Sequence, residues 1–184
     1  VINLAAKSFW KSLFLVIRVI YFCRFSISHT TVTELRNNYY TLTIMKTVLI
    51  TGGTRGIGLS TAINFQQKGW EVYITSRKQE NLDLVIKEYP ELKGFVARAD
   101  DLAAASETCM KIKDETGSLD VLINNAGTNP SGGSLMDVEL SAVQKTWDVN
   151  LMGPLMWTRE AVKSGLKESV LNVCSVGGIK PSHY

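Results

Sequence analysis

A glycine-rich loop between an apolar strand and a helix constrains the fold of this chain more than any other feature. Residues 46–51 (KTVLIT) form a continuous apolar, β-branched run, as expected of a strand buried on both faces. The loop over 51–58 (TGGTRGIG) leads into a helical pattern over 59–68 that stops at Gly69. Glycines here allow a tight turn and let backbone amides approach a pyrophosphate at the helix N-terminus. A tight connection alone would also use glycine, but the strand–loop–helix context favours phosphate or dinucleotide binding. No Gly-Lys-Ser/Thr follows, so the loop is not a Walker A motif.

The rest of the chain alternates strands and helices in the same way. Apolar runs predict strands over 71–75, 94–98, 119–123 and 170–174, and helical spacing predicts helices over 79–89, 103–115 and 141–163. We expect the last helix to be loosened at Gly153 and Pro154. Strands and helices alternating at these lengths imply a parallel sheet with right-handed crossovers. The sequence therefore predicts an α/β fold, a Rossmann-type doubly wound parallel sheet, over residues 45–184.

Residues 1–44 differ from the rest of the chain. They contain no Gly or Pro, hold eight of the sixteen aromatic residues and carry a net charge of +4, whereas the whole chain carries +3. Met45, the first methionine, opens the first predicted strand directly, which favours a leader that is not part of the native fold. A membrane anchor is a second interpretation. Against it, Arg18 splits two apolar pieces far shorter than a spanning helix of roughly 20 residues, and a central arginine costs about 2.5–3.5 kcal/mol. A targeting peptide is the third, although no initiating Met or clear cleavage site supports it.

Composition and charge exclude several classes of protein. The net charge of +3 is too small to argue for a nucleic-acid partner. Cys23, Cys109 and Cys174 have no metal-ligand or redox spacing, and no His/Cys/carboxylate cluster predicts a metal site. A reducing, cytoplasmic location is therefore expected, with membrane attachment only if residues 1–44 belong to the native protein.

Three further features fall at strand ends or in the long helix. They are residues 124–127 (NNAG) after the fourth strand, Asn150 in the long helix, and Ser175 at the end of the fifth strand. Together with the glycine loop, these elements resemble, in order, the T-G-x-x-x-G-I-G, N-N-A-G, asparagine and serine elements of the short-chain dehydrogenase/reductase family, in its shorter branch. The resemblance covers about residues 45–184. By itself Asn150 could cap a helix kink, and Ser175 could be any strand-end serine.

The resemblance implies an oxidoreductase that transfers hydride between a nicotinamide cofactor and a small carbonyl or alcohol substrate. It implies that Ser175 orients the substrate oxygen and that Asn150 holds a proton-relaying water. Either Asp100 or Asp101, after the third strand, would contact the adenine amino group, and their adjacency leaves the choice open. Asn124 is expected to have a structural part. The expected cofactor-binding residues are Gly52, Thr54, Arg55, Gly56, Ile57, Gly58, Arg77, Asp100, Asp101, Asn125, Ala126 and Gly127.

The residues after the second strand predict which nicotinamide cofactor binds. An acidic residue there would hydrogen-bond the ribose of NAD and repel a 2′-phosphate. This chain instead has residues 75–78 (TSRK), in which Arg77 offers bidentate donors to a phosphate. Arg55 in the glycine loop adds a second cation. Both match family members that prefer NADP(H), which is therefore expected over NAD(H). The plain alternative is two solvated surface cations.

In this family a Y-x-x-x-K motif, which supplies the general acid, follows the catalytic serine, and no such motif follows Ser175 in this chain. Tyr184 follows Ser175 by nine residues and is the last residue, and Lys180 precedes it. A shortened loop would make Tyr184 the catalytic tyrosine. The favoured interpretation is a truncated reductase, with a Rossmann-type sheet that is incomplete at the C-terminal side and without turnover of its own. A non-catalytic dinucleotide-binding protein and a membrane-anchored reductase remain as alternatives. By family analogy alone, the helix over 141–163 would serve a homo-oligomer.

Overall fold

Strands and helices alternate along the chain, as the sequence pattern predicts. The computed structural model describes residues 45–130 and 135–175, so the expected leader over residues 1–44, Lys180 and Tyr184 lie outside the described residues. The strands are β1 (Thr47–Ile50), β2 (Glu71–Ser76), β3 (Lys93–Val96), β4 (Val121–Asn124) and β5 (Ser169–Asn172). The helices are α3 (Gly56–Gln67), α4 (Gln79–Glu88), α5 (Leu102–Thr116), the short 3-10 helix η1 (Leu135–Asp137), α6 (Leu140–Trp147), the π-helical segment η2 (Asp148–Met152) and α7 (Gly153–Lys163).

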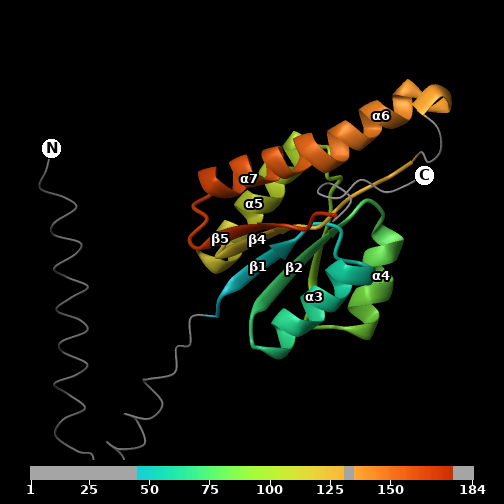
Figure 1. Cartoon of the computed structure of the whole chain (residues 1–184). Coiled ribbons are helices and arrows are strands. Elements are labelled where there is room, and N and C mark those ends of the chain that lie inside the picture. The colour runs from blue at the N-terminus through green and yellow to red at the C-terminus, as the bar shows by residue number, and fades with distance from the viewer. Residues whose placement is uncertain (1–44, 131–134, 176–184) are drawn as a thin grey trace, which may run out of the picture. The chain divides into compact units, whose positions relative to one another are not determined.

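The described strands form one parallel sheet in the order β3-β2-β1-β4-β5 (Figure 1). Register pairs run from Thr47 opposite Glu71 to Ile50 opposite Ile74, and Ile50 also pairs with Ile123. The first described strand, β1, lies in the middle of the sheet. From there the chain winds outward to β3 and then returns to the other side of β1. This is the doubly wound order that the sequence predicts. The carboxyl ends of β1 and β4 meet at its topological switch point, where open α/β sheets bind ligands.

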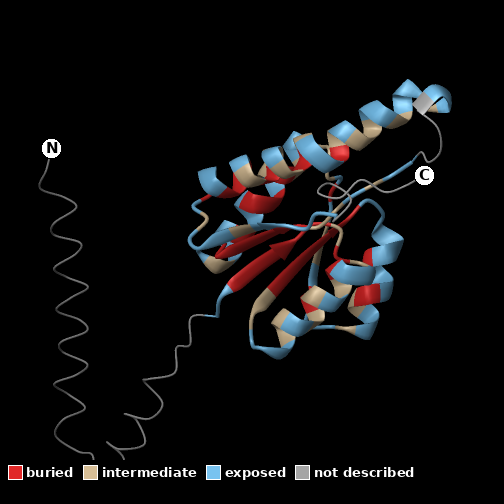
Figure 2. Ribbon diagram, viewed as in Figure 1, coloured by how far each residue is buried: buried red, intermediate tan, exposed pale blue. Residues whose placement is uncertain are grey.

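Helices cover both faces of the sheet, and each face has its own apolar core (Figures 1 and 2). Successive side chains of a strand point to opposite faces. In β1, Val48 and Ile50 therefore face α3 and α4, while Leu49 faces α5 and α7. All three are fully buried. The apolar strand run predicted from the sequence thus arises because β1 has no solvent face.

The long helix predicted over 141–163 is interrupted. The α-helical geometry changes to a π-helical turn at Asp148–Met152, and the backbone N–H of Gly153 donates to the carbonyl of Asp148, five residues earlier. The sequence predicted loosening at Gly153 and Pro154, one turn too late. Proline has no N–H, so the α-type bond that is lost would have ended on the carbonyl of Asn150, four residues before it.

Within residues 45–130 and 135–175, no helix is both long and apolar enough to cross a bilayer. The same residues contain no group of three or more His, Cys, Asp or Glu side chains arranged to hold a metal ion.

Candidate cofactor groove and active site

The glycine loop leaves β1 and is held against the end of β2. The backbone N–H of Gly52 donates to Thr75 Oγ1 at 3.2 Å, and that of Gly53 donates to the Thr75 carbonyl at 3.1 Å. Gly52 and Gly56 have φ values of +65° and +54°, a region that favours glycine. The turn therefore requires glycine at both positions, and it starts α3 at Gly56.

A second loop, after β4, interlocks with the glycine loop. Asn125 Nδ2 donates to the carbonyls of Thr51 and Gly52 at 3.0 and 3.1 Å. Thr51 Oγ1 accepts from the backbone N–H groups of Asn125 and Ala126 at 3.0 and 3.1 Å. A Cβ at Gly58 would lie 2.5 Å from both Asn125 Nδ2 and the Gly52 carbonyl, so this close packing excludes a side chain there. The two loops form one rigid wall at the switch point.

A groove of about 750 Å³ lies along this wall. This volume is within the range of sites that hold a small molecule or cofactor. All but one of the residues expected to bind the cofactor line it: Gly52, Thr54, Arg55, Gly56, Ile57, Gly58, Arg77, Asp100, Asn125, Ala126 and Gly127. The exception is Asp101.

The two adjacent acids after β3 have different roles. Asp101 caps α5, because its side chain accepts from the backbone N–H of Ala104 at 3.0 Å. Asp100 lines the groove instead and forms ion pairs with Arg98 and with Lys145. Burial alone raises the pKa of the Asp100 carboxyl, but the hydrogen bonds from Arg98 and Lys145 outweigh it and lower the pKa to about 2. The geometry thus separates the two residues between which the sequence left the choice open.

Cations dominate the charge of the groove. Arg55, Arg77, Lys78 and Lys145 all line it, and Asp100 is the one carboxylate among the lining residues. Arg55, Arg77 and Lys78 are exposed, whereas Lys145 is partly buried. Three of the four cations come from the glycine loop and the turn after β2, so the groove favours an anion between these two segments.

Asn150 lies in the π-helical segment, where it pairs with the loop after β4. Its Oδ1 accepts from the backbone N–H of Thr128 at 2.8 Å, and its Nδ2 donates to the Thr128 carbonyl at 2.7 Å. Its neighbour Val149 is buried and lines the groove. A Cβ at Gly127 would lie 3.7 Å from Asn150 Oδ1, an ordinary van der Waals contact, so this approach does not require glycine there. The Asn150 side chain therefore holds the backbone on both sides of Thr128, a residue of the groove wall.

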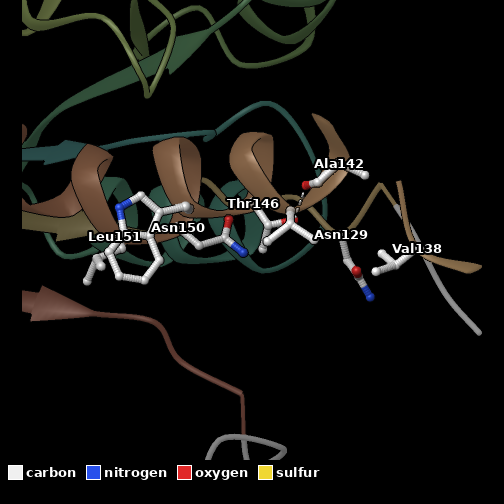
Figure 3. A pocket seen from close by; sticks show the side chains of 8 residues that line it. Asn129, Val138, Ala142, Thr146, Asn150 and Leu151 are labelled. Atoms are coloured by element: carbon white, nitrogen blue, oxygen red, sulfur yellow. Dashed lines mark hydrogen bonds between the residues drawn. The ribbon is translucent and has the colours of Figure 1, made fainter. Parts of the chain in front are cut away.

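A second hollow, of about 380 Å³, is lined by residues of the loop after β4, of α6 and of η2, together with Val138 (Figure 3). Figure 3 shows Asn150 among its lining side chains and the hydrogen bond from Thr146 Oγ1 to the Ala142 carbonyl, 2.8 Å long. The hollow is lined by Asn129, Val138, Ala142, Val143, Thr146, Trp147, Asn150 and Leu151. Asn150 lines this hollow, and its chain neighbour Val149 and its hydrogen-bond partner Thr128 line the groove. Asn150 therefore lies where the linings of the two hollows meet.

Asn124 and Ser175 lie at the carboxyl ends of neighbouring strands. Asn124 is buried, and its Nδ2 donates to Asn172 Oδ1 at 2.9 Å and to Thr158 Oγ1 at 3.2 Å. Asn124 therefore has the structural part that the sequence suggested, joining β4 to β5 and α7. Ser175 follows β5 and is exposed at the same edge of the sheet.

The sequence interpretation missed four residues that shape the groove. Thr51 and Thr75 hold the glycine loop through their hydroxyl groups, and Lys145 and Val149 form part of the far wall. Thr51 could have been found, since it opens the glycine motif. The other three carried no local signal, because their roles depend on which elements the fold brings together.

The model of the short chain dehydrogenase family matches residues 46–184. The match covers most of the chain and includes the glycine loop, Asn150 and Ser175. The chain belongs to the short-chain dehydrogenase family.

Individual relatives agree with this assignment. The chain is 35% identical over 147 residues to dehydrogenase/reductase SDR family member 4 of Pongo abelii, covering 74% of this chain and 52% of that protein. It is 28% identical over 141 residues to tropinone reductase-like 3 of Erythroxylum coca, covering 74% and 55%. The chain spans about half the length of these curated relatives.

A solved structure, ElxO with NADP bound, matches with a TM-score of 0.71 and 29% identity, covering 76% of this chain and 59% of that one. Other similar structures were also solved with NADP or NADPH.

Proposed function

We propose that the complete protein is an NADP(H)-dependent oxidoreductase that interconverts a carbonyl and an alcohol on a small-molecule substrate. One observation carries the proposal: a groove at the switch point of the sheet is lined by the glycine loop and by four cations against a single carboxylate. Membership of the family supports the reaction class, and the NADP-bound structural neighbours support the cofactor.

The glycine loop fits the diphosphate of such a cofactor. A Cβ at Gly52 would lie 3.0 Å from Ala126 Cα, whereas a Cβ at Gly56 would meet nothing within 4 Å. The loop is thus packed on its inner side and open at Gly56, where α3 begins. Backbone N–H groups at a helix N-terminus have no partner inside the helix and attract anions. When bound, the nicotinamide would accept or donate the hydride.

The turn after β2 fits the 2′-phosphate. Arg77 and Lys78 follow directly on Ser76, the last residue of β2, and Arg55 precedes α3. All three line the groove, and no carboxylate occupies residues 76–78. A guanidinium gives two parallel hydrogen bonds to a phosphate, which a lone ribose hydroxyl cannot match. Arg77 would therefore select the phosphorylated cofactor.

Asn150 and Ser175 would serve the reacting end. Oδ1 and Nδ2 of Asn150 each form one hydrogen bond with the backbone of Thr128. A side-chain amide can accept two hydrogen bonds at its oxygen and donate two from its nitrogen, so each atom has one hydrogen-bonding position left. The remaining positions would hold the proton-relaying water. The Ser175 hydroxyl would orient the substrate oxygen and stabilise charge that develops on it. The tyrosine that donates the proton in this family belongs to a Y-x-x-x-K motif after the serine. No such motif follows Ser175 in this chain, so activity is proposed for the complete protein.

The experiment is a titration of the protein with NADPH and with NADH, followed by cofactor fluorescence. Wild-type protein should bind NADPH more tightly, and Arg77→Glu should weaken NADPH by roughly 10- to 100-fold, since hydrogen bonds to charged groups contribute about 1.5–3 kcal/mol. Binding of NADH should change much less. Lys87→Glu is the matched control, because it reverses an exposed charge on α4 that does not line the groove.

Two results would contradict the proposal. An equal loss of NADPH and NADH binding in Arg77→Glu would mean that Arg77 does not meet the 2′-phosphate. Failure of the wild-type protein to bind either nucleotide would contradict the proposal that this groove holds a nicotinamide cofactor.

A further inference from the structure

A row of residues spaced by four runs along α6, η2 and α7 and faces the turn between β3 and α5. The row is Lys145, Val149, Gly153 and Trp157. Lys145 contacts Asp100, and Gly153 and Trp157 contact Ala99. Val149, Ala99 and Asp100 line the cofactor groove together. Two parts of the groove wall that are distant in sequence are therefore joined along one helix face.

The contacts of the row are close and specific. Trp157, which is 1% exposed, donates from Nε1 to the Ala99 carbonyl at 3.1 Å. At Gly153 a Cβ would lie 2.8 Å from the same carbonyl, so the helix backbone approaches the turn as closely as glycine permits. At the other end, the Lys145 ammonium pairs with Asp100, whose side chain is only 13% exposed. The row therefore holds Ala99 through a hydrogen bond and close packing, and it holds the neighbouring Asp100 through an ion pair.

The π-helical segment keeps the row aligned. A four-residue repeat exceeds the 3.6 residues of an α-helical turn, so such a row drifts around the helix in one direction. Hydrogen bonds that span five residues make the helix turn more slowly at Asp148–Met152, which shifts the drift the other way. Asn150 lies in this same segment. Its orientation is therefore tied to the register of the row.

Lys145 is the member of the row whose effect is electrostatic rather than steric. Its side chain is 33% exposed, and Asp100 also accepts two hydrogen bonds from Arg98, at 3.1 and 3.0 Å. Arg98 is outside the groove lining, whereas Lys145 is part of it. Arg98 thus orients the carboxylate from outside the groove lining, and Lys145 connects the carboxylate to the helical segment that carries Asn150.

We propose that Lys145 is a positioning residue, which through its ion pair with Asp100 fixes the start of the π-helical segment and so holds the Asn150 amide on the backbone of Thr128. The residue does not itself touch the reacting atoms. Its importance for the reaction rests on the proposed function, but its effect on Asn150 is a property of the protein without cofactor. Asp100 would accordingly connect the cofactor groove with the asparagine.

The test is residue-resolved hydrogen exchange on the full chain without cofactor. The Thr128 N–H is protected by its bond to Asn150 Oδ1. In Lys145→Met, which keeps much of the side-chain length without the charge, protection of this amide should fall at least about fivefold. Protection of the central strand amides of Leu49 and Leu122 should stay as in the wild type. Lys145→Arg should retain protection at Thr128, because it preserves the ion pair.

Matched variants make the outcome decisive. Lys111→Met removes the same type of pair, with Glu107, from an exposed face of α5 and should leave Thr128 unchanged. Asp100→Asn breaks the proposed pair from its other side and should reproduce the loss, which keeps the test valid if Lys145→Met folds poorly. Unchanged protection at Thr128, or an equal fall at Thr128 and in the central strands, would overturn the proposal.

A parallel titration with NADPH separates this inference from the proposed function. Weaker NADPH binding by Lys145→Met together with the exchange effect supports both. If the wild-type protein does not bind NADPH, the proposed function fails, while the exchange result still decides the role of Lys145.

Discussion

At the scale of the residue, Asp100 carries an unusual share of the electrostatics of the groove. Its carboxylate is mostly buried and meets two cations from different elements, Arg98 after β3 and Lys145 in α6. Burial opposes its ionisation, and the two hydrogen-bond donors favour it more strongly, so its pKa falls from 3.8 to about 2. The folded state therefore binds a proton at Asp100 less readily than the unfolded chain does.

This difference predicts how stability depends on pH. Since the pKa is lower in the folded state, the contribution of Asp100 is fully present above about pH 4 and is lost as the pH falls toward about 2. Asp100→Asn should lose about 1–2 kcal/mol at pH 7 and show a shallower fall in acid. Urea unfolding at pH 7, 4 and 3 measures both effects.

The exposed Asp114 on α5 provides the control for this measurement. Asp114→Asn should match the wild type at each pH. An acid profile of Asp100→Asn that runs parallel to the wild type would show that the ion pairs of Asp100 do not stabilise the fold.

Residues in local motifs could be predicted from the sequence, and residues placed by tertiary contacts could not. Gly52, Gly56 and Gly58 were recognisable because a strand, a tight turn and a helix follow each other directly in the chain. The separate roles of Asp100 and Asp101 depend on a helix cap and on Lys145, which is 45 residues away from Asp100. No spacing rule along the chain contains that information.

At the scale of the element, the break in the long helix is the feature that sequence periodicity described least well. The bounds of the strands and of the longer helices were predicted to within a few residues. The π-helical segment was not predicted, because the apolar spacing of an α-helix with one wide turn is nearly the same as that of an unbroken helix. Pro154 gave the one signal. Its consequence appears at Asp148–Met152, because the missing donor acts on a carbonyl one turn earlier.

The close approach at Gly153 gives a prediction with an unexpected sign. In an exposed helix, replacing glycine by alanine stabilises by about 1 kcal/mol. At Gly153 the new methyl group would lie 2.8 Å from the Ala99 carbonyl, a backbone atom that cannot rotate away. We expect Gly153→Ala to destabilise the protein by about 1–3 kcal/mol, as overpacking does.

Thermal and urea unfolding of Gly153→Ala check this prediction. Val162→Ala, on the exposed side of α7, should stay within about 0.5 kcal/mol of the wild type. A Gly153→Ala protein as stable as the wild type, or more stable, would mean that α7 can move away from the turn at no cost.

At the scale of the whole sheet, two apolar cores share the same strands. Ile74 in β2 belongs to the core under α3 and α4, and Ile112 in α5 belongs to the core on the opposite face, where Tyr73 of β2 also lies. Because neighbouring residues of one strand serve different cores, neither core can lose its packing while the other keeps an intact sheet. The described sheet and its helices should therefore unfold as one unit.

The last prediction tests this shared sheet with one repeated substitution. Ile74→Val and Ile112→Val each remove one buried methylene and should cost about 0.5–1.5 kcal/mol. In the double variant the costs should add to within about 0.5 kcal/mol, since the two sites lie in separate cores. Ile50→Val with Ile74→Val is the contrasting pair, because these residues are register partners in one core and should depart from additivity.

Urea unfolding followed by far-UV circular dichroism and by tryptophan fluorescence should give coincident transitions, since Trp70 packs against one core and Trp157 lies in the other. Separate transitions for the two signals, or strong coupling between Ile74 and Ile112, would show that the two faces do not behave as independent cores on one cooperative sheet.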